Sequence, residues 1–240
     1  MDSRSNENKS IANGATFHEA LANCWSAGYG GGGFLRRIIF FRTRMQECVR
    51  TADRWLDAGC GSGVLSRELG RLGAEVVAVD GSPKMIQVAK QETEIFHGDI
   101  FFKEVSTIED IDEPDESFDG ALCSSVIEYV DCPDSTFEEL SRVTKPGGII
   151  LVSVPNMYSP TRLAQMALRA IGSQFGKEYY PYLAVSRHSY STRSIHATLE
   201  LAGFLIDRID HFDPLFSGFF AHLRLGSLLL ITAHKRNNGK

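Results

Sequence analysis

The sequence lacks any apolar run that approaches the ~18 residues needed to span a bilayer. The best candidate, LGSLLLITA near the C-terminal end, is short and contains a β-branched residue pair, which fits a buried strand better. The opening stretch, MDSRSNENKS, is polar and has no apolar segment of the secretory-signal type. We therefore expect no integral membrane association and a cytoplasmic location.

Two further absences narrow the class of protein. The five cysteines are odd in number and include no CxxC pair, which argues against a disulfide framework and a zinc site and predicts reduced thiols. Positive charge is not in excess either, because the formal net charge is −5 at pH 7. Proteins that grip phosphate backbones cluster Lys and Arg, so we expect no nucleic-acid partner.

From about residue 51 onward, segments typical of strands alternate with segments typical of helices. Strands are expected at RWLDAG, AEVVAVD, EIFHGD, FDGALCSS and IILVSVP, with helices at VLSRELGRLG, SPKMIQVAKQ and DSTFEELSRV. Near the C-terminal end, FLIDRIDHF and SLLLITAHK suggest an antiparallel hairpin. Such alternation predicts an α/β fold with a doubly wound, mostly parallel sheet and helices on both faces.

The chain length and the continuous alternation favour one domain over residues 1–240. We divide it into an N-terminal helical cap or lid (1–50), a ligand-binding core (51–155), a helical insert (156–190) and a C-terminal helix with a strand hairpin (191–240). The glycine run at 28–33 is expected to interrupt the N-terminal helical segment as a hinge, because four consecutive glycines disfavour a helix.

Glycines occupy alternate positions in WLDAGCGSGVL, where Gly59, Gly61 and Gly63 follow the first expected strand. A strand that runs into a glycine turn before a helix creates a binding crevice at the carboxyl end of a sheet. A Walker-type phosphate loop needs Lys followed by Ser or Thr, but Val64 and Leu65 come next. The dinucleotide fingerprint needs a glycine at position 64 or 66, and neither is present. The missing glycine argues against the hypothesis of dinucleotide binding, which stays open as an alternative.

The segments that follow the turn indicate which class of ligand it binds. LDAGCGSG is followed by an acid at the end of VVAVD, then by HGD, FDGALCSSVIEYV and TKPGG. In this order and context, the stretch from about Trp55 to Pro155 resembles the class I S-adenosylmethionine-dependent methyltransferases. It is similar to the branch that serves ubiquinone and menaquinone biosynthesis, which methylates O, N or C atoms of small metabolites. The resemblance implies a seven-stranded sheet of order 3-2-1-4-5-7-6, with the last strand antiparallel, and a small helical cap.

The resemblance also implies S-adenosylmethionine as the cofactor. Gly59, Gly61 and Gly63 would surround its methionyl part, and Asp57 would orient the turn or meet the ammonium group. Asp80, at the end of the second strand, would accept the ribose hydroxyls, which suits a carboxylate.

The adenine and sulfonium ends of the cofactor have their own expected residues. Asp99 matches the family acid near the adenine amine, with Ile100 beside the ring, and Ser125 would line the sulfonium region. The remaining residues expected in the cofactor site are Cys60, Gly81, Met85, Gly98 and Ser124.

Candidate catalytic residues are few. Methyl transfer from a sulfonium is an in-line displacement that gains mainly from alignment and water exclusion, and a base is needed only when the acceptor keeps a proton. Many relatives have EHV where this chain has Glu128, Tyr129 and Val130. Tyr129 is a poor base at a pKa near ~10, and we interpret Glu128 as structural. His188 in RHSYST is the candidate base, and Tyr29 is expected to help close the N-terminal lid.

The insert 156–190 is rich in aromatic and apolar residues. We weigh three roles for it: a cover for a small hydrophobic or aromatic methyl acceptor, ordinary core, and the contact of a homodimer. No metal is expected, because the fourth strand ends in ALCSS without carboxylates. The acidic run 109–117 lacks calcium-loop spacing, and we expect it to form a solvated loop. Two alternatives to a methyltransferase stay open: an NAD(P)-dependent oxidoreductase and a non-catalytic adenosyl-binding subunit.

Overall fold

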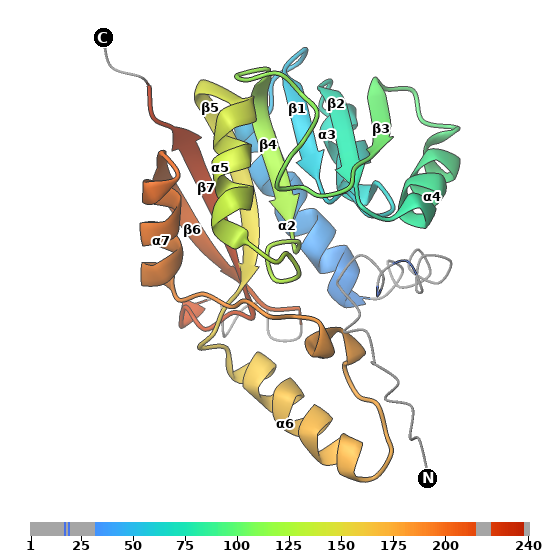
Figure 1. Cartoon of the computed structure of the whole chain (residues 1–240), viewed down its shortest axis with the longest axis vertical. Helices are drawn as coiled ribbons and strands as arrows, with labels where there is room; N and C mark the ends of the chain where they lie inside the picture. The colour runs from blue at the N-terminus through green and yellow to red at the C-terminus, as the bar shows by residue number, and fades with distance from the viewer. Residues whose placement is uncertain (1–16, 18, 20–31, 215–221, 238–240) are drawn as a thin grey trace, which may run out of the picture.

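The computed structural model describes residues 17, 19, 32–214 and 222–237, shown in Figure 1. Within them, seven strands form one sheet: β1 Arg54–Ala58, β2 Glu75–Asp80, β3 Ile100–Glu104, β4 Phe118–Ser124, β5 Thr144–Pro155, β6 Phe204–Phe212 and β7 Leu228–Lys235. The strand order is β3-β2-β1-β4-β5-β7-β6. Strand β7 runs antiparallel to both of its neighbours, β5 and β6, and all the other pairs are parallel. The predicted sheet, its order and the direction of its last strand are confirmed.

Helices cover both faces of this sheet, as predicted (Figure 1). The described helices are α2 Gly32–Cys48, α3 Val64–Arg71, α4 Pro83–Thr93, α5 Pro133–Val143, α6 Pro160–Gln174, α7 Thr192–Leu201 and the short 3-10 helix η1 Pro181–Ala184. The apolar sides of α5 and α7 pack into one core, and those of α2 and α3 pack into the core on the opposite face. The sheet thus separates two hydrophobic layers.

The side chains of strand β2 alternate between these two layers. Val77 and Val79 are buried in the core beside α5, whereas Val76 and Ala78 are buried in the core beside α2. Successive side chains of a strand point to opposite faces, so a central parallel strand buried on both sides is a continuous apolar run. The segment EVVAVD has this form and ends with its one acid at the edge of the sheet.

The start of α4 follows from local chemistry. The Oγ atom of Ser82 accepts a hydrogen bond from the Met85 N–H at 3.3 Å, and Pro83 occupies the first turn. Serine at the N-cap satisfies an otherwise unpaired amide, and proline at the first position loses no hydrogen bond. The predicted start of this helix is confirmed.

The third strand differs from its prediction. The sequence predicts it at EIFHGD (residues 94–99), but β3 begins at Ile100, the residue directly after that segment. The true strand, Ile100–Glu104, pairs in parallel with β2, with Ile100 opposite Val76 and Glu104 opposite Asp80. Both FHGD and IFFKE offer apolar residues, and glycine at position 98 suits the turn that precedes a strand. The correction moves the carboxyl end of the third strand five residues along the chain.

Two further expectations need correction. Helix α2 begins at Gly32, so Gly32 and Gly33 at the end of the glycine run are helical; the apolar contacts of Phe41 and Met45 offset the low helix propensity of its first turn. Residues 28–31 lie outside the residues that the structure describes, so the hinge stays a prediction there. The acidic segment 109–117 is also not simply a solvated loop, because Ile111 and Glu113 within it are buried.

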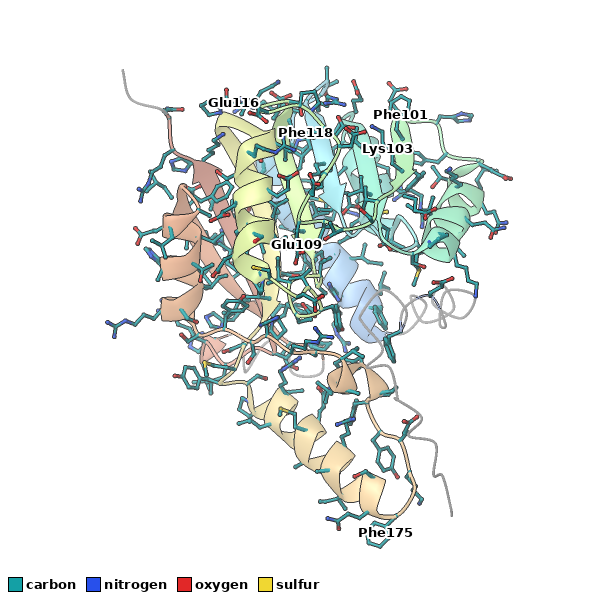
Figure 2. The ribbon with its side chains drawn as sticks, viewed as in Figure 1. Phe101, Lys103, Glu109, Glu116, Phe118 and Phe175 are labelled. Atoms are coloured by element: carbon teal, nitrogen blue, oxygen red, sulfur yellow. The ribbon has the colours of Figure 1, made fainter. Side chains whose placement is uncertain are left out.

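The insert contains α6, which extends away from the sheet (Figure 1). Only Thr161 and Gly172 of this helix are buried. Figure 2 shows Phe175 at its far tip, where this side chain is 73% exposed. None of the described helices combines the length and the apolar character that a bilayer span requires.

Candidate functional site

A cavity of about 810 Å³ lies at the carboxyl ends of β1, β2 and β4. Helix α2 contributes Phe34 and Arg37 to its wall, while α6 and η1 contribute Arg162 and Tyr182. The N-terminal helical segment and the insert therefore both border it, in agreement with Figure 1, where α2 and η1 lie toward this end of the sheet. Ligands of open α/β sheets bind at this edge, and the volume is near the upper end for small-molecule sites.

The glycine turn after β1 lies against the cavity. Gly59, Gly61 and Gly63 all have positive φ angles, of 77°, 54° and 71°. A Cβ atom on Gly59 would lie 2.3 Å from Val126 Cγ2, whereas one on Gly61 would meet nothing within 4 Å. Gly59 and Gly61 line the cavity, but Gly63 does not. The turn thus needs glycine at position 59 for packing, and at position 61 it presents bare backbone to the open space.

Two carboxylates flank this turn. The Gly61 N–H donates to Oδ2 of Asp80 at 2.8 Å, and the Ser82 N–H donates to its Oδ1 at 2.8 Å. Asp57 is buried and accepts a hydrogen bond of 2.6 Å from the Ser66 hydroxyl. Burial raises the pKa of Asp57 to about 7; the Ser66 bond opposes this rise, and the negative charge of Asp80 adds to it. The glycine turn therefore lies in a negative electrostatic environment.

Cys60, between these glycines, also faces the cavity. Burial raises the pKa of its thiol well above the usual value, and the charges of Asp57 and Asp80 raise it further. The thiol is therefore neutral near pH 7 and offers an apolar surface to a ligand. Gly81 and Met85, which follow β2, complete this side of the cavity.

The residues expected at the adenine end lie elsewhere. Gly98 and Asp99 are exposed and precede β3, and the Asp99 carbonyl accepts the Val76 N–H at the start of β2. Neither they nor Ile100 line the cavity. They lie at the amino edge of the sheet because the third strand begins at Ile100 rather than ending at Asp99.

The segment that follows β3 takes their place. Ser106, Thr107, Ile108 and Glu109 line the cavity. The Thr107 hydroxyl accepts the Glu109 N–H at 3.2 Å, and Glu109 Oε1 accepts the Cys132 N–H at 2.9 Å. Figure 2 shows Glu109 at the opposite end of the sheet from Phe118, which begins β4. The apolar residues of IFFKEV are typical of a strand. Recognising that strand in the sequence would have located the cavity-lining segment that follows β3.

The end of β4 is held by hydrogen bonds from two other elements. Nη2 of Arg37, on α2, donates to the Ser124 hydroxyl at 2.8 Å and to the Ser125 hydroxyl at 2.7 Å. The Ser125 N–H donates to Oγ of the buried Ser153 on β5 at 3.0 Å, and Ser125 has a φ of 55°. Both serines line the cavity, so the structure brings the predicted Ser124 and Ser125 to it.

Glu128 and Tyr129 lie in the segment between β4 and α5 and also line the cavity. Glu128 is 5% exposed, and its Oε2 atom is buried without a hydrogen-bond partner among the described residues. Burial raises the pKa of Glu128 to about 7, against the lowering effects of its own backbone N–H and of the charges of Arg37 and Arg162. Burial also raises the pKa of Tyr129 well above its usual value, so this phenol stays protonated.

His188 does not reach the cavity. It is absent from the cavity wall, and its Nε2 lies 3.0 Å from the Val130 carbonyl oxygen. The neighbouring Arg187 N–H donates to the Glu128 carbonyl at 2.7 Å. The RHSYST segment therefore holds the backbone of a residue in the cavity wall. Tyr29, the third expected catalytic residue, lies outside the residues that the structure describes.

Nine of the predicted cofactor residues come together at one cavity: Asp57, Gly59, Cys60, Gly61, Asp80, Gly81, Met85, Ser124 and Ser125. Within the described part of the chain, no three His, Cys, Asp or Glu residues are arranged to hold a metal ion. The arrangement suits an elongated organic ligand with a cationic end at the glycine turn.

Comparison with known proteins agrees with this geometry. Residues 56–152, from β1 into β5, match the methyltransferase domain family. The ubiquinone biosynthesis O-methyltransferase of Xanthomonas oryzae pv. oryzae (strain PXO99A) is 33% identical over 123 residues, which are 51% of this chain and 49% of that protein. The one from Bradyrhizobium sp. (strain ORS 278) is 37% identical over 128 residues, covering 53% and 48%. The chain spans about half the length of these curated relatives.

Solved structures extend the likeness to the whole fold. The magnesium protoporphyrin IX methyltransferase of Synechocystis PCC 6803, solved with bound SAH, has a TM-score of 0.67 at 18% identity, over 91% of this chain and 96% of that one. The cyclase SpnF has a TM-score of 0.69 at 17% identity, over 93% and 95%. The resemblance to class I S-adenosylmethionine-dependent methyltransferases, predicted from the motifs, is confirmed. Because a cyclase shares the fold, the reaction must be argued from the site.

Proposed function

We propose that this protein transfers the methyl group of S-adenosylmethionine to an O, N or C atom of a small, aromatic or hydrophobic metabolite. The observation that carries the proposal is the pair of carboxylates, Asp57 and Asp80, on either side of the open backbone at Gly61. A ligand with an ammonium group and a sulfonium is attracted to this environment. The pyrophosphate of a dinucleotide would be repelled by it, which disfavours the oxidoreductase.

The residues present fit this cofactor. A carboxylate has about four acceptor positions, so the ribose hydroxyls can share Asp80 with the two backbone amides that it binds. The absence of a side chain at Gly61 leaves room for the methionyl part, and Asp57 suits its ammonium group. We now assign the adenine end to Ser106, Thr107 and Ile108 in place of Asp99, because they border the cavity beyond Asp80.

When bound, S-adenosylmethionine supplies a methyl group on a positively charged sulfur. The chain's own task is to align the acceptor with that group and to exclude water. Arg37 fixes the end of β4, where Ser124 and Ser125 border the space between the two ligands. The far end of the cavity, formed by Tyr129, Arg162 and Tyr182, would take the acceptor.

Calorimetric titration with S-adenosylhomocysteine and with NADH tests this proposal. We expect saturable binding of the first and none of the second. Tight NADH binding without S-adenosylhomocysteine binding would reject it. A non-catalytic adenosyl-binding subunit would bind the cofactor but release no S-adenosylhomocysteine with any quinol, phenol, indole or amine in an acceptor screen.

A further inference from the structure

Glu128 differs from the other buried glutamates in the part of the chain that the structure describes. Glu113 pairs with Arg54 and Lys103, and Glu139 accepts the Ile111 N–H at 2.6 Å while it also pairs with an arginine. Buried carboxylates with a structural role are normally saturated with donors in this way. Oε2 of Glu128 has no such donor among the described residues, although the residue is 5% exposed.

The position of Glu128 in the cavity wall suggests a role for its unpaired carboxylate oxygen. It belongs to the wall at the end proposed for the acceptor, beside Tyr129. Its backbone is fixed, because its carbonyl oxygen accepts the Arg187 N–H at 2.7 Å. A buried carboxylate oxygen that lacks a donor, on a residue that lines a ligand cavity, is a candidate acceptor for a ligand hydroxyl.

The charged groups around Glu128 indicate which donor it would meet. Arg37 from α2 and Arg162 from α6 both act electrostatically on it, and both line the cavity. The titratable neighbours that feel its charge are Cys123, Tyr129, Tyr182 and Tyr190, and burial raises the pKa of each, so they stay neutral. Two fixed positive charges against one carboxylate disfavour an ammonium ligand and favour a neutral or anionic hydroxyl compound.

We propose that Glu128 is the general base that accepts the proton of a hydroxyl-bearing methyl acceptor. This inference rests on the proposed function and names its acceptor class. The acceptor oxygen forms a bond to the methyl carbon as the carbon–sulfur bond breaks, and the electron pair of that bond passes to sulfur. The hydroxyl proton passes to Oε2 of Glu128, which becomes a neutral carboxylic acid and later returns the proton to solvent.

The test uses the full chain saturated with S-adenosylhomocysteine and two small probes, catechol and benzylamine, titrated at pH 6 and pH 8. If the hydroxyl binds the ionised form of Glu128, whose pKa burial raises to about 7, catechol binds about tenfold more weakly at pH 6 than at pH 8. Benzylamine binds weakly at both. In Glu128→Gln the catechol difference disappears, whereas the exposed Glu138→Gln keeps it.

A second probe works without any variant. The dimethyl ether of catechol has the same ring but no hydroxyl, so its binding to the wild-type chain should not change between pH 6 and pH 8. With S-adenosylmethionine instead, Glu128→Gln should lower catechol turnover by about 100-fold or more while S-adenosylhomocysteine binding is unchanged.

The outcomes separate the two proposals. Catechol that fails to bind the loaded protein, binds equally at both pH values, or keeps its pH dependence in Glu128→Gln overturns the role of Glu128. Stronger binding of benzylamine than of catechol overturns the acceptor class. Failure of S-adenosylhomocysteine itself to bind overturns the proposed function.

Discussion

At the residue scale, Asp80 and Asp99 lie at opposite ends of neighbouring strands, so they provide a matched pair of substitutions. Asp80→Ala should weaken S-adenosylhomocysteine binding by about 1.5–3 kcal/mol, the scale of hydrogen bonds to a charged group. Asp99→Ala should leave the affinity unchanged, because Asp99 is exposed at the far edge of the sheet. Calorimetry measures both. An equal loss in the two variants would mean that the ligand does not occupy the cavity described above.

The glycines of the turn separate packing from binding. Gly59→Ala places a methyl group 2.3 Å from Val126 Cγ2 at a positive φ, so we expect a loss of about 2–4 kcal/mol of unfolding free energy. Gly61→Ala meets no neighbour and should cost only about 1 kcal/mol from its φ. Its methyl group would instead enter the ligand space and weaken cofactor binding. Chemical denaturation and calorimetry on both variants check this contrast, and the reverse pattern would contradict it.

The sequence motifs correctly brought residues of the glycine turn and of the end of β2 to one cavity, but they did not predict the rest of its wall. Gly59, Gly61 and Asp80 follow strands whose apolar pattern is unambiguous, so their meeting at one edge follows from parallel pairing. Glu128 was interpreted as structural and His188 as the base. Only the three-dimensional contacts show that Oε2 of the glutamate lacks a donor among the described residues and that the histidine faces Val130 instead. The burial of one side chain depends on segments far apart in the sequence.

At the scale of elements, prediction succeeded where a local signal was decisive. Ser82 with Pro83 marks the start of α4 unmistakably, whereas the third strand was misplaced because residues 94–104 contain two short apolar stretches. Pairing with β2 selects the second stretch, and pairing is a tertiary property that no local pattern supplies.

Helices α5 and α6 should differ in local stability. Phe137, Leu140 and Val143 of α5 are fully buried, while α6 buries only Thr161 and Gly172. Burial of three large apolar side chains contributes about 4 kcal/mol or more, so amide hydrogens of α5 should exchange about a thousandfold more slowly. Hydrogen exchange followed by mass spectrometry measures this, and equal protection would mean that α6 has a packing partner in solution.

At the scale of the whole molecule, Asp57 and Glu128 link folding to pH. Burial raises both pKa values to about 7, from ordinary values of 3.8 and 4.5. The folded state therefore binds these protons more tightly than the unfolded state, and stability falls as pH rises through about 7. From pH 6 to pH 8 we expect a loss of roughly 1 kcal/mol for each group in the ligand-free protein.

Thermal melts at the two pH values measure this effect. The double variant Asp57→Asn, Glu128→Gln should show a flatter dependence and a higher melting temperature at pH 8. The carboxylates Glu113 and Asp119, whose pKa values are lowered, change protonation only under more acidic conditions and do not contribute in this window. A wild-type melting temperature that rises from pH 6 to pH 8 would contradict the prediction.

The cavity wall combines the sheet with added segments. The strand ends and their connecting turns form one part, helix α2 adds Phe34 and Arg37, and the insert between β5 and α7 adds Arg162 and Tyr182. Residues 156–190 can therefore diverge, or be exchanged by design, without disturbing the hydrogen bonds of Asp80 and Asp57. A chain built in this way can acquire new substrates while it keeps the same cofactor as methyl donor.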